Sequence, residues 1–227
     1  MRLTENQLRD IIRVVIKEAI KRPSVFMHVT GNTGCGKTTL MGQLMTDYPQ
    51  YIFFDLDEFG EMATDELGWD HGWGQKGWTE EKGQAWKEMT QKVAEDFIAN
   101  ADKPIVFFGI HHNTTKGVPD PYLFFNAKHK LFMDVDPELC AERKFSRDQK
   151  RMEVYDDGSI YIGGSTIKKP WTKPGIDIDD PDIIDKIMEA LVDAVHVFNN
   201  EVISMDYQPA DEIEIRNILE NNRNSMR

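Results

Sequence analysis

Short apolar runs alternate along the chain with longer stretches in which apolar residues recur every three or four positions. Four runs have the length and the β-branched or aromatic content of buried strands: 24–30, 51–59, 104–110 and 128–136. The helical spacing between and after these runs predicts helices at 38–48, 79–100, 137–152 and 180–198. Buried strands that alternate with helices are typical of an α/β fold, in which a parallel sheet carries helices on both faces.

The first 22 residues carry an amphipathic pattern of their own. Thr4 and Gln7 have the spacing of a capping box, in which each side chain satisfies a backbone donor at a helix start. The apolar positions that follow have helical spacing: Leu8, Ile11, Ile12, Val15, Ile16 and Ala19. Pro23 ends this pattern, and two interpretations stay open: a helix packed on the domain, or a docking segment for a partner.

The length and the pattern together predict one main domain with additions. The expected parts are an N-terminal helix at 1–22, a main domain at 23–205 with insertions at about 60–100 and about 140–175, and a helical tail at 206–227. Within the second insertion, Asp157-Gly158 stands between β-forming residues, which indicates a β-hairpin. Asp180 is a candidate N-cap for the helix that follows.

The formal net charge of the chain is −12. Non-specific nucleic-acid binding needs a broad basic surface, so this charge argues against that class, although 143–151 (RKFSRDQKR) concentrates positive charge locally. The two cysteines, Cys35 and Cys140, have no metal-binding spacing, which predicts a reducing, cytoplasmic setting. We expect no membrane span, because no apolar run reaches about 18 residues, and no signal-peptide pattern opens the chain.

The stretch GNTGCGKTT, residues 31–39, fits the phosphate-binding pattern G-x-x-x-x-G-K-[ST] in full and lies between a strand pattern and a helix pattern. Glycines let the backbone turn its N–H groups toward phosphate oxygens, and the positive end of the next helix adds to the attraction. Lys37 is placed to reach the outer phosphates of ATP, and the Thr38 hydroxyl to bind Mg²⁺. The expected nucleotide-binding residues are Gly31, Asn32, Thr33, Gly34, Cys35, Gly36, Lys37, Thr38 and Thr39.

Three acids, Asp55, Asp57 and Glu58, close the second apolar run and are candidates for the acceptor side of a site. Strand alternation would put Asp55 and Asp57 on the same side, close to the glycine loop if the two strands are neighbours. We assign Asp55 to a metal-bound water and Asp57 to orienting an acceptor hydroxyl and taking its proton. The alternative is that these acids are solvated residues at a strand end.

These motifs resemble those of the P-loop kinases of small metabolites, which include nucleoside, nucleotide, shikimate and gluconate kinases. In the shikimate and gluconate kinases a D-x-D pair faces the metal and the substrate hydroxyl, which implies those roles for Asp55 and Asp57. The stretch FMDVDPELCAERKFSRD (132–148) is similar to the strand-and-lid segment of deoxynucleoside and thymidylate kinases, which implies that Arg143 and Arg147 are lid arginines.

A guanidinium is always charged and stabilises the charge that develops on a transferred phosphoryl group. Arg143 and Arg147 are four residues apart and would share one helix face, for which a solvated basic face is the alternative. The resemblance covers about 24–152 and implies a P-loop NTPase fold that uses ATP and Mg²⁺.

The acceptor side is expected to include a stretch at 67–86 that holds four tryptophans: Trp69, Trp73, Trp78 and Trp86. Tryptophan faces stack on nucleobases, at about 1–3 kcal/mol per base, and the alternative is an insertion that folds around its own tryptophans. Trp73 and His111 are the candidate substrate contacts, with structural roles open for both. The expected acceptor is a small molecule, a nucleoside or nucleotide, or a hydroxymethylated base in DNA, so nucleic acid would bind only as a specific substrate.

Two further classes stay open beside the kinase. A P-loop NTPase switch or motor usually has an acid at the tip of a strand such as 104–110, but that run ends FFGIHHN. An idle nucleotide-binding or interaction protein would act through 1–22. The opening MRLTENQLR resembles the start of many tailed-phage proteins, which would place this chain in a host cytoplasm. The oligomeric state is not defined by any of these patterns.

Overall fold

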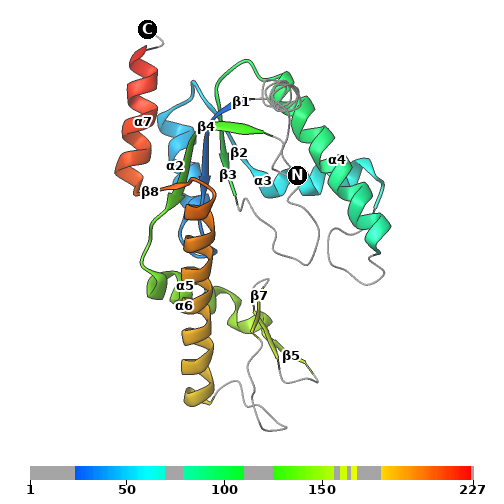
Figure 1. Cartoon of the computed structure of the whole chain (residues 1–227), viewed down its shortest axis with the longest axis vertical. Coiled ribbons are helices and arrows are strands. Elements are labelled where there is room, and N and C mark those ends of the chain that lie inside the picture. Colours follow the sequence, from blue (N-terminus) through cyan, green and yellow to red (C-terminus); the bar gives the residue numbers. More distant parts are fainter. Residues whose placement is uncertain are drawn as a thin grey trace, which may run out of the picture. The chain divides into compact units, whose positions relative to one another are not determined.

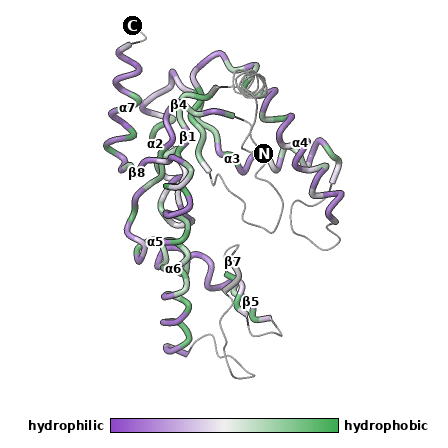
Figure 2. The backbone as a smooth tube through the Cα atoms, in the orientation of Figure 1, coloured by the Kyte–Doolittle hydropathy of each residue, from purple (hydrophilic) through white to green (hydrophobic). Residues whose placement is uncertain are grey.

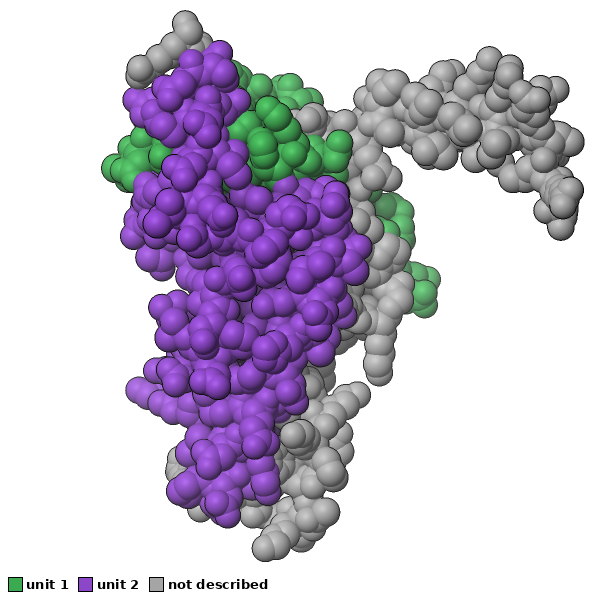
Figure 3. Space-filling model, turned by 60° about the vertical axis from the view of Figure 1, so that its left-hand side comes forward, with its two compact units in different colours: residues 1–28, 45–129 green, residues 29–44, 130–227 purple. Residues whose placement is uncertain are grey.

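The computed structural model describes residues 24–69, 79–109, 125–155, 159–162, 165–167 and 180–225. The helix expected at 1–22 lies outside these described residues. The chain divides into two compact units, which Figure 3 shows in different colours. Unit 1 comprises Met1–His28 and Met45–His129, and unit 2 comprises Val29–Leu44 and Lys130–Arg227.

Five strands form the main sheet, in the order β2-β3-β1-β4-β8 (Figure 1). Their bounds are Ser24–Thr30 for β1, Ile52–Asp55 for β2, Ile105–Phe108 for β3, Asn126–Met133 for β4 and Gln208–Ala210 for β8. β2 runs parallel to β3, with Asp55 opposite Phe108, and β4 runs parallel to β8, with Met133 opposite Ala210. The expected α/β fold with a parallel sheet is thereby confirmed. The strand order also places β3 between β2 and β1, so the strand with the acids is not the neighbour of the strand that enters the glycine loop.

The helices confirm most of the predicted pattern. Their bounds are Lys37–Asp47 for α2, Leu56–Glu66 for α3, Glu80–Ala99 for α4, Pro137–Asp148 for α5, Pro181–Ser204 for α6 and Glu212–Ser225 for α7. A short 3₁₀ turn, Gln149–Arg151, continues α5. The predicted hairpin is also present, because β5 (Glu153–Val154) pairs antiparallel with β6 (Ile160–Ile162), and β6 pairs with β7 (Ser165–Ile167).

The strand expected at 51–59 is wrong in its second half, because the chain turns into helix α3 directly after Asp55. Asp55 is the N-cap of α3, and its Oδ1 accepts a hydrogen bond from the backbone N–H of Asp57 at 3.1 Å. The buried residues of α3 recur at helical spacing, at Leu56, Phe59, Gly60, Ala63 and Thr64. An acidic N-cap followed by this spacing is a signal for a helix. The aromatic residues just before Asp55 favour a strand, and they made this signal easy to miss.

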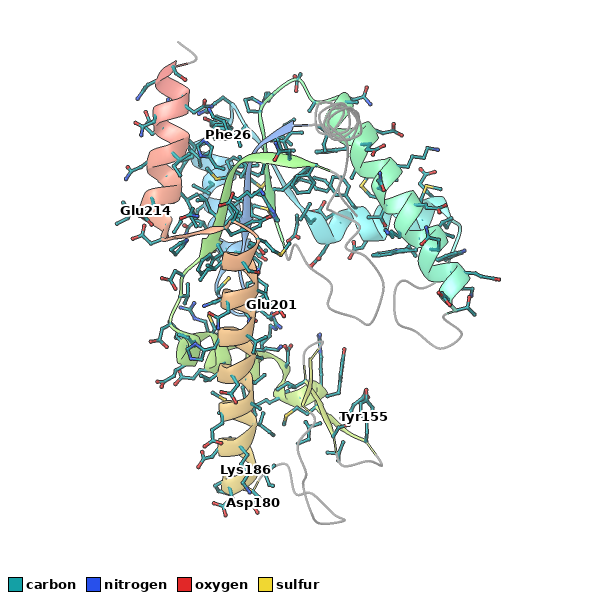
Figure 4. All side chains as sticks on the ribbon, in the orientation of Figure 1. Phe26, Tyr155, Asp180, Lys186, Glu201 and Glu214 are labelled. Carbon is teal, nitrogen blue, oxygen red and sulfur yellow. The ribbon has the colours of Figure 1, made fainter. Side chains whose placement is uncertain are left out.

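Strand β8 is a second element that the pattern did not indicate. It is three residues long and contains Pro209, which has no N–H to donate and is therefore typical of an edge strand. The helix α7 that follows begins with a reciprocal capping box, in which Asp211 and Glu214 each accept from the other's backbone N–H, at 2.8 and 3.0 Å. Figure 4 labels Glu214 at this helix start. Ile215 and Leu219 are fully buried, so α7 packs on unit 2 as the expected tail helix.

The core of unit 1 is built mainly from aromatic rings on β2, β3, α3 and α4. The ring centroid of Phe54 lies 4.4 Å from that of Phe59 and 4.5 Å from that of Phe97. Phe107 meets Phe59 nearly edge-on at 5.6 Å. Aromatic pairs of this kind contribute about 0.5–1.5 kcal/mol each beyond the area that they bury. They hold α3 and α4 against the strands and so position the start of α3, where the acids lie.

Trp86 of α4 packs against Gly60 of α3 and so holds the two helices together. Its indole Nε1–H donates to the Gly60 carbonyl at 3.1 Å and to the Thr64 hydroxyl at 3.2 Å. A Cβ built at Gly60 would lie 2.7 Å from Cζ2 of the same indole, so the ring occupies the space that a side chain would need. Trp86 is therefore part of the packing of unit 1, which favours the structural interpretation for this tryptophan.

The core of unit 2 joins α5, α6 and the hairpin. Ile187 and Leu191 of α6 cluster with Ala141 of α5 and with Ile160 and Ile162 of β6. Figure 2 shows hydrophobic and hydrophilic positions alternating along α6, as expected for a helix with one buried face. The predicted N-cap of α6 is confirmed, because the Asp180 carboxylate accepts from the Asp182 N–H at 3.0 Å, and Figure 4 labels Asp180 at this end. Among the helices that the structure describes, none combines the length and the apolar character needed to cross a membrane.

The Trp86 contact predicts opposite effects for two glycine substitutions. Gly60→Ala is expected to lower the free energy of unfolding by about 1–3 kcal/mol, because the added methyl group overlaps an indole that two hydrogen bonds hold in place. Gly42→Ala in helix α2 is the matched control, because a Cβ there meets no atom within 4 Å, and it is expected to stabilise by about 0.4–1 kcal/mol. Urea unfolding of both variants measures the difference. An unchanged midpoint for Gly60→Ala would contradict the packing described for Trp86.

Candidate nucleotide-binding site

The glycine loop of unit 2 has the strand–loop–helix setting that the motif requires. It leaves β1 after Thr30 and ends where α2 begins at Lys37. Gly34 has φ +91° and Gly36 has φ +95°, which are left-handed conformations that glycine adopts without a steric penalty. The first turn of α2 contains no acidic residue, so its positive N-terminal end is not neutralised locally by a carboxylate of that turn. The predicted phosphate-binding residues, Gly31 to Thr39, are thus brought together on one loop and one helix start.

Lys37 lies across the loop. Its Nζ donates hydrogen bonds to the carbonyl oxygens of Gly31 and of Asn32, the second at 3.0 Å, and it lies 3.7 Å from the Cys35 sulfur. The ammonium is therefore held above the turn by backbone oxygens that a phosphate can replace as partners. Thr38 and Thr39 are exposed in the first turn of α2, so the Thr38 hydroxyl is accessible from solvent.

The loop is pressed against the first turns of α5. A Cβ built at Gly34 would lie 2.5 Å from the carbonyl oxygen of Cys140 and 3.4 Å from the backbone nitrogen of Lys144. A backbone oxygen cannot move aside as a flexible side chain does, so Gly34 is required by this contact as well as by its φ. Gly34 occupies a variable position of the motif, and the sequence therefore gave no signal of this second constraint.

Of the two predicted lid arginines, Arg143 is the one that contacts the loop. Its Nη1 donates to the Gly34 carbonyl at 3.4 Å and would lie 3.9 Å from a Cβ built at Gly36. The guanidinium therefore lies beside the same backbone turn whose N–H groups form the phosphate-binding motif. This placement fits a role in neutralising phosphate charge, and it comes from helix α5, about a hundred residues further along the chain.

Arg147 is engaged elsewhere. Its Nε donates to Oδ1 of Asp148 at 2.9 Å, and its Nη2 donates to Oδ2 of the same carboxylate. Asp148 is 3% exposed, and the buried Lys144 ammonium also interacts with it electrostatically. The hydrogen bond from Arg147 holds the pKa of Asp148 below its ordinary value, and burial lowers the pKa of Lys144. The basic row at 143–151 is thus partly a set of charges that pair with one another, through Lys144, Arg147 and Asp148. The sequence pattern alone had suggested one exposed basic face.

The two cysteines meet behind the loop. Cys35, Cys140 and Val195 form a small buried cluster with Met133 and Val135 packed against it. Burial, and to a smaller extent the neighbouring Cys35, raise the pKa of Cys140 to about 11, although Arg143 and Lys37 oppose the shift. A thiol with this pKa is uncharged at neutral pH, so Cys140 serves as a small apolar side chain in this packing.

The acids of unit 1 lie at the junction of β2 and α3. Asp55 is half-buried as the N-cap, and Asp57 and Glu58 are exposed in the first turn of the helix. The expectation that strand alternation puts Asp55 and Asp57 on one side is therefore wrong, because the residues are joined by a helix cap. Burial, with Asp55 and Glu61 nearby, raises the pKa of Glu58 above its ordinary value. Asp55 stands opposite Phe108 in the β2–β3 register, so the acids follow the carboxyl end of β2.

Of the other acceptor-side candidates, some lie within the described residues and some do not. Trp69 is half-buried at the end of α3, with Lys82 Nζ 5.9 Å from the centre of its ring. Trp73, Trp78, His111 and His112 lie outside the described residues. Within the described part of the chain, no group of three or more histidine, cysteine or carboxylate residues is arranged to hold a metal ion.

Comparisons with solved structures return kinases at low similarity. A gluconokinase from Sinorhizobium meliloti 1021 is 14% identical, with a TM-score of 0.31, over 80% of this chain and 99% of the other. A shikimate kinase from Bacteroides thetaiotaomicron is 17% identical, with a TM-score of 0.38, over 89% and 98%. A putative kinase from Chloroflexus aurantiacus j-10-fl is 20% identical, with a TM-score of 0.36, over 78% and 99%. No protein-family model and no curated protein matches the chain. TM-scores below 0.5 define no function, so the functional interpretation rests on the loop geometry.

The Arg147–Asp148 pair predicts a pH-dependent contribution to stability. A carboxylate whose pKa is depressed by folding stabilises the protein above its unfolded pKa, and loses that contribution as the pH falls through the folded pKa. Asp148→Asn is therefore expected to lower the free energy of unfolding by about 1–3 kcal/mol at pH 7, with the difference from the native protein shrinking below about pH 4.

Denaturant unfolding between pH 3 and pH 7 measures this difference. Asp193→Asn is the matched control, because Asp193 is exposed on α6, and we expect a change within about 0.5 kcal/mol. A constant effect of Asp148→Asn across that range would show that its charge does not contribute through this pair.

Proposed function

We propose that this protein is an ATP- and Mg²⁺-dependent kinase that transfers the γ-phosphoryl group to a hydroxyl or phosphate acceptor. The observation that carries the proposal is the glycine loop between β1 and α2, with Lys37 across it and Arg143 against it. Backbone N–H groups, a lysine and an arginine around one turn make a site for a polyphosphate, because each favours negative charge.

On the donor side, each residue has a distinct task. The N–H groups of the loop bind the phosphates of ATP, and Lys37 exchanges its bonds to the Gly31 and Asn32 carbonyls for bonds to the outer phosphates. Arg143, already beside the loop, stabilises the charge that develops on the γ-phosphoryl group during transfer. Arg147 is paired with Asp148 of the same helix, so the proposal assigns charge stabilisation to Arg143 first and to Arg147 only if it leaves that pair.

The residues also fit Mg²⁺. This ion prefers oxygen ligands and keeps several waters, so one hydroxyl and one or two carboxylates, together with ATP phosphates, are sufficient. Thr38 offers an exposed hydroxyl next to Lys37, and Asp55 offers a carboxylate at the end of β2, so these two are the proposed metal residues. When bound, Mg²⁺ would neutralise negative charge on the β- and γ-phosphates.

On the acceptor side, Asp57 is proposed as the general base. It is exposed in the first turn of α3, and its backbone N–H is fixed by the Asp55 cap, so its position is set by the helix start. Glu58, exposed in the same first turn, is proposed to contact the acceptor. The leading acceptors are a nucleoside, a nucleotide and a hydroxymethylated base in DNA. The net charge of −12 favours the smaller two.

A direct test uses γ-labelled ATP and Mg²⁺ with pools of nucleosides, deoxynucleoside monophosphates, hydroxy acids, sugars, and DNA with or without hydroxymethylated pyrimidines. Label is expected to move to one pool, which names the acceptor class. Lys37→Ala is expected to reduce this transfer at least about a hundredfold, because it removes a charge that stabilises the transferred group. Lys186→Ala, an exposed lysine on α6, is the control and should retain native transfer. Label released only as free phosphate would instead indicate an NTPase without an acceptor, and unchanged transfer by Lys37→Ala would refute the loop assignment.

Substitution of the proposed base separates binding from transfer. Asp57→Asn is expected to leave the Kd for ATP nearly unchanged and to lower kcat by about 10²–10⁴, because an amide cannot accept the acceptor proton. Asp65→Asn, an exposed aspartate on the same helix, should change neither. Calorimetric titration with ATP and steady-state kinetics measure the two effects. An equal loss of ATP binding would assign Asp57 to the metal or to the fold.

A further inference from the structure

Unit 1 has an apolar groove between α3 and α4 that the proposed kinase chemistry does not use. Its volume is about 440 Å³. The floor consists of Ile52, Val93, Phe97 and Ala101, which also pack on the buried core of unit 1. Met62, which is 40% exposed, and Met89 form its sides. A groove lined by methionine and aromatic side chains suits an apolar helix face, because methionine adapts its shape to its partner.

A second hollow continues this groove toward the start of β1. It measures about 300 Å³ and shares Ala101 with the first. Val25 and Phe26 line it, together with Ile98 and Ile105. The chain segment before β1 therefore reaches the described structure at one end of this surface. Figure 4 labels Phe26 on β1, and Figure 1 shows α3 and α4 of the same unit.

The rim of the first hollow is acidic. Glu66, Asp96 and Asp102 are exposed around it, against one lysine, Lys92. Residues 1–22 carry six basic and three acidic side chains, while the whole chain has a net charge of −12. The segment and the rim of the first hollow thus have opposite net charge. This favours binding of the segment to the rim, whereas the rest of the chain is acidic and would be repelled by it.

We propose that residues 1–22 of this chain bind this groove as an amphipathic helix. The apolar positions Leu8, Ile11, Ile12, Val15, Ile16 and Ala19 share one helical face that would cover the floor. A helix of 22 residues is about 33 Å long, and α4, with 20 residues, is about 30 Å long, so the segment matches the helix that it would lie along. Arg9 and Arg22 flank that face and would meet the acidic rim, while Arg13, Lys17 and Lys21 lie on the outer face of the helix. This proposal does not depend on the kinase activity.

Zero-length cross-linking of the full-length protein carrying Arg9→Lys and Arg22→Lys tests the contact, because positions 9 and 22 flank the apolar face of the helix. A carbodiimide joins a lysine amine to a carboxylate that touches it. We expect the amines introduced at these two positions to link to Glu66, Asp96 or Asp102 within one chain, whereas Lys17 and Lys21, on the opposite face, should not. A mixture of ¹⁴N- and ¹⁵N-labelled protein separates links within a chain from links between chains. Links only between chains would assign the groove to a second copy, and links only to carboxylates outside the groove would place the segment elsewhere; either result overturns the proposal.

Two adjacent valines provide a matched pair of variants. Val15 belongs to the apolar face and Val14 lies off it, so Val15→Asp and Val14→Asp introduce the same chemistry on opposite sides. Val15→Asp is expected to abolish the cross-links and to raise amide hydrogen exchange at 89–102 about tenfold, with Val14→Asp close to native. Equal effects of the two substitutions, or no effect of either, would overturn the proposal. If Val15→Asp fails to fold, the cross-links of the protein with Arg9→Lys and Arg22→Lys alone still decide.

Discussion

The glycine loop of this protein depends on the close packing of its backbone against helix α5. Gly34 lies so near the Cys140 carbonyl that no side chain fits between them, and the Arg143 guanidinium bonds the Gly34 carbonyl from the same helix. The buried cluster of Cys35, Cys140 and Val195 fills the space behind the turn. Loop and helix therefore form one packed unit, because backbone atoms and buried side chains cannot shift independently at native packing density. The arginine that the kinase proposal needs is delivered by the helix that also supports the loop.

The basic residues of helix α5 have different partners. Arg143 faces the loop, whereas Arg147 is tied to Asp148, which also interacts with the buried Lys144. An unpaired charge in the interior is costly, so the carboxylate makes it possible to bury Lys144 beside the core of α5 and α6. A basic row in the sequence thus yields one arginine beside the glycine loop and one that is paired within its own helix.

Unit 1 carries the acids that the proposal assigns to the acceptor. Its aromatic core holds α3 and α4 on β2 and β3, and the cap formed by Asp55 fixes where the exposed acids begin. The same two helices leave an apolar groove with an acidic rim, near the start of β1. A core that leaves this much apolar surface uncovered is well suited to receive an amphipathic segment of the same chain.

The sequence by itself determined the α/β class, the glycine loop, the hairpin and most helices, because these depend on local periodicity, on glycine and on capping residues within a few positions. The spacing of Gly31, Gly36, Lys37 and Thr38 was sufficient to predict the loop between a strand and a helix. The tertiary structure decided which residues meet. It placed Arg143, but not Arg147, on the loop, brought Cys35 to Cys140, and buried Trp86 on Gly60. The helix at Asp57 is a different case, because its local signal, the Asp55 N-cap, is present in the sequence but follows an aromatic run that favoured a strand. Contacts between residues far apart in the chain depend on how helices pack on the sheet, and single-sequence periodicity carries no information about that packing.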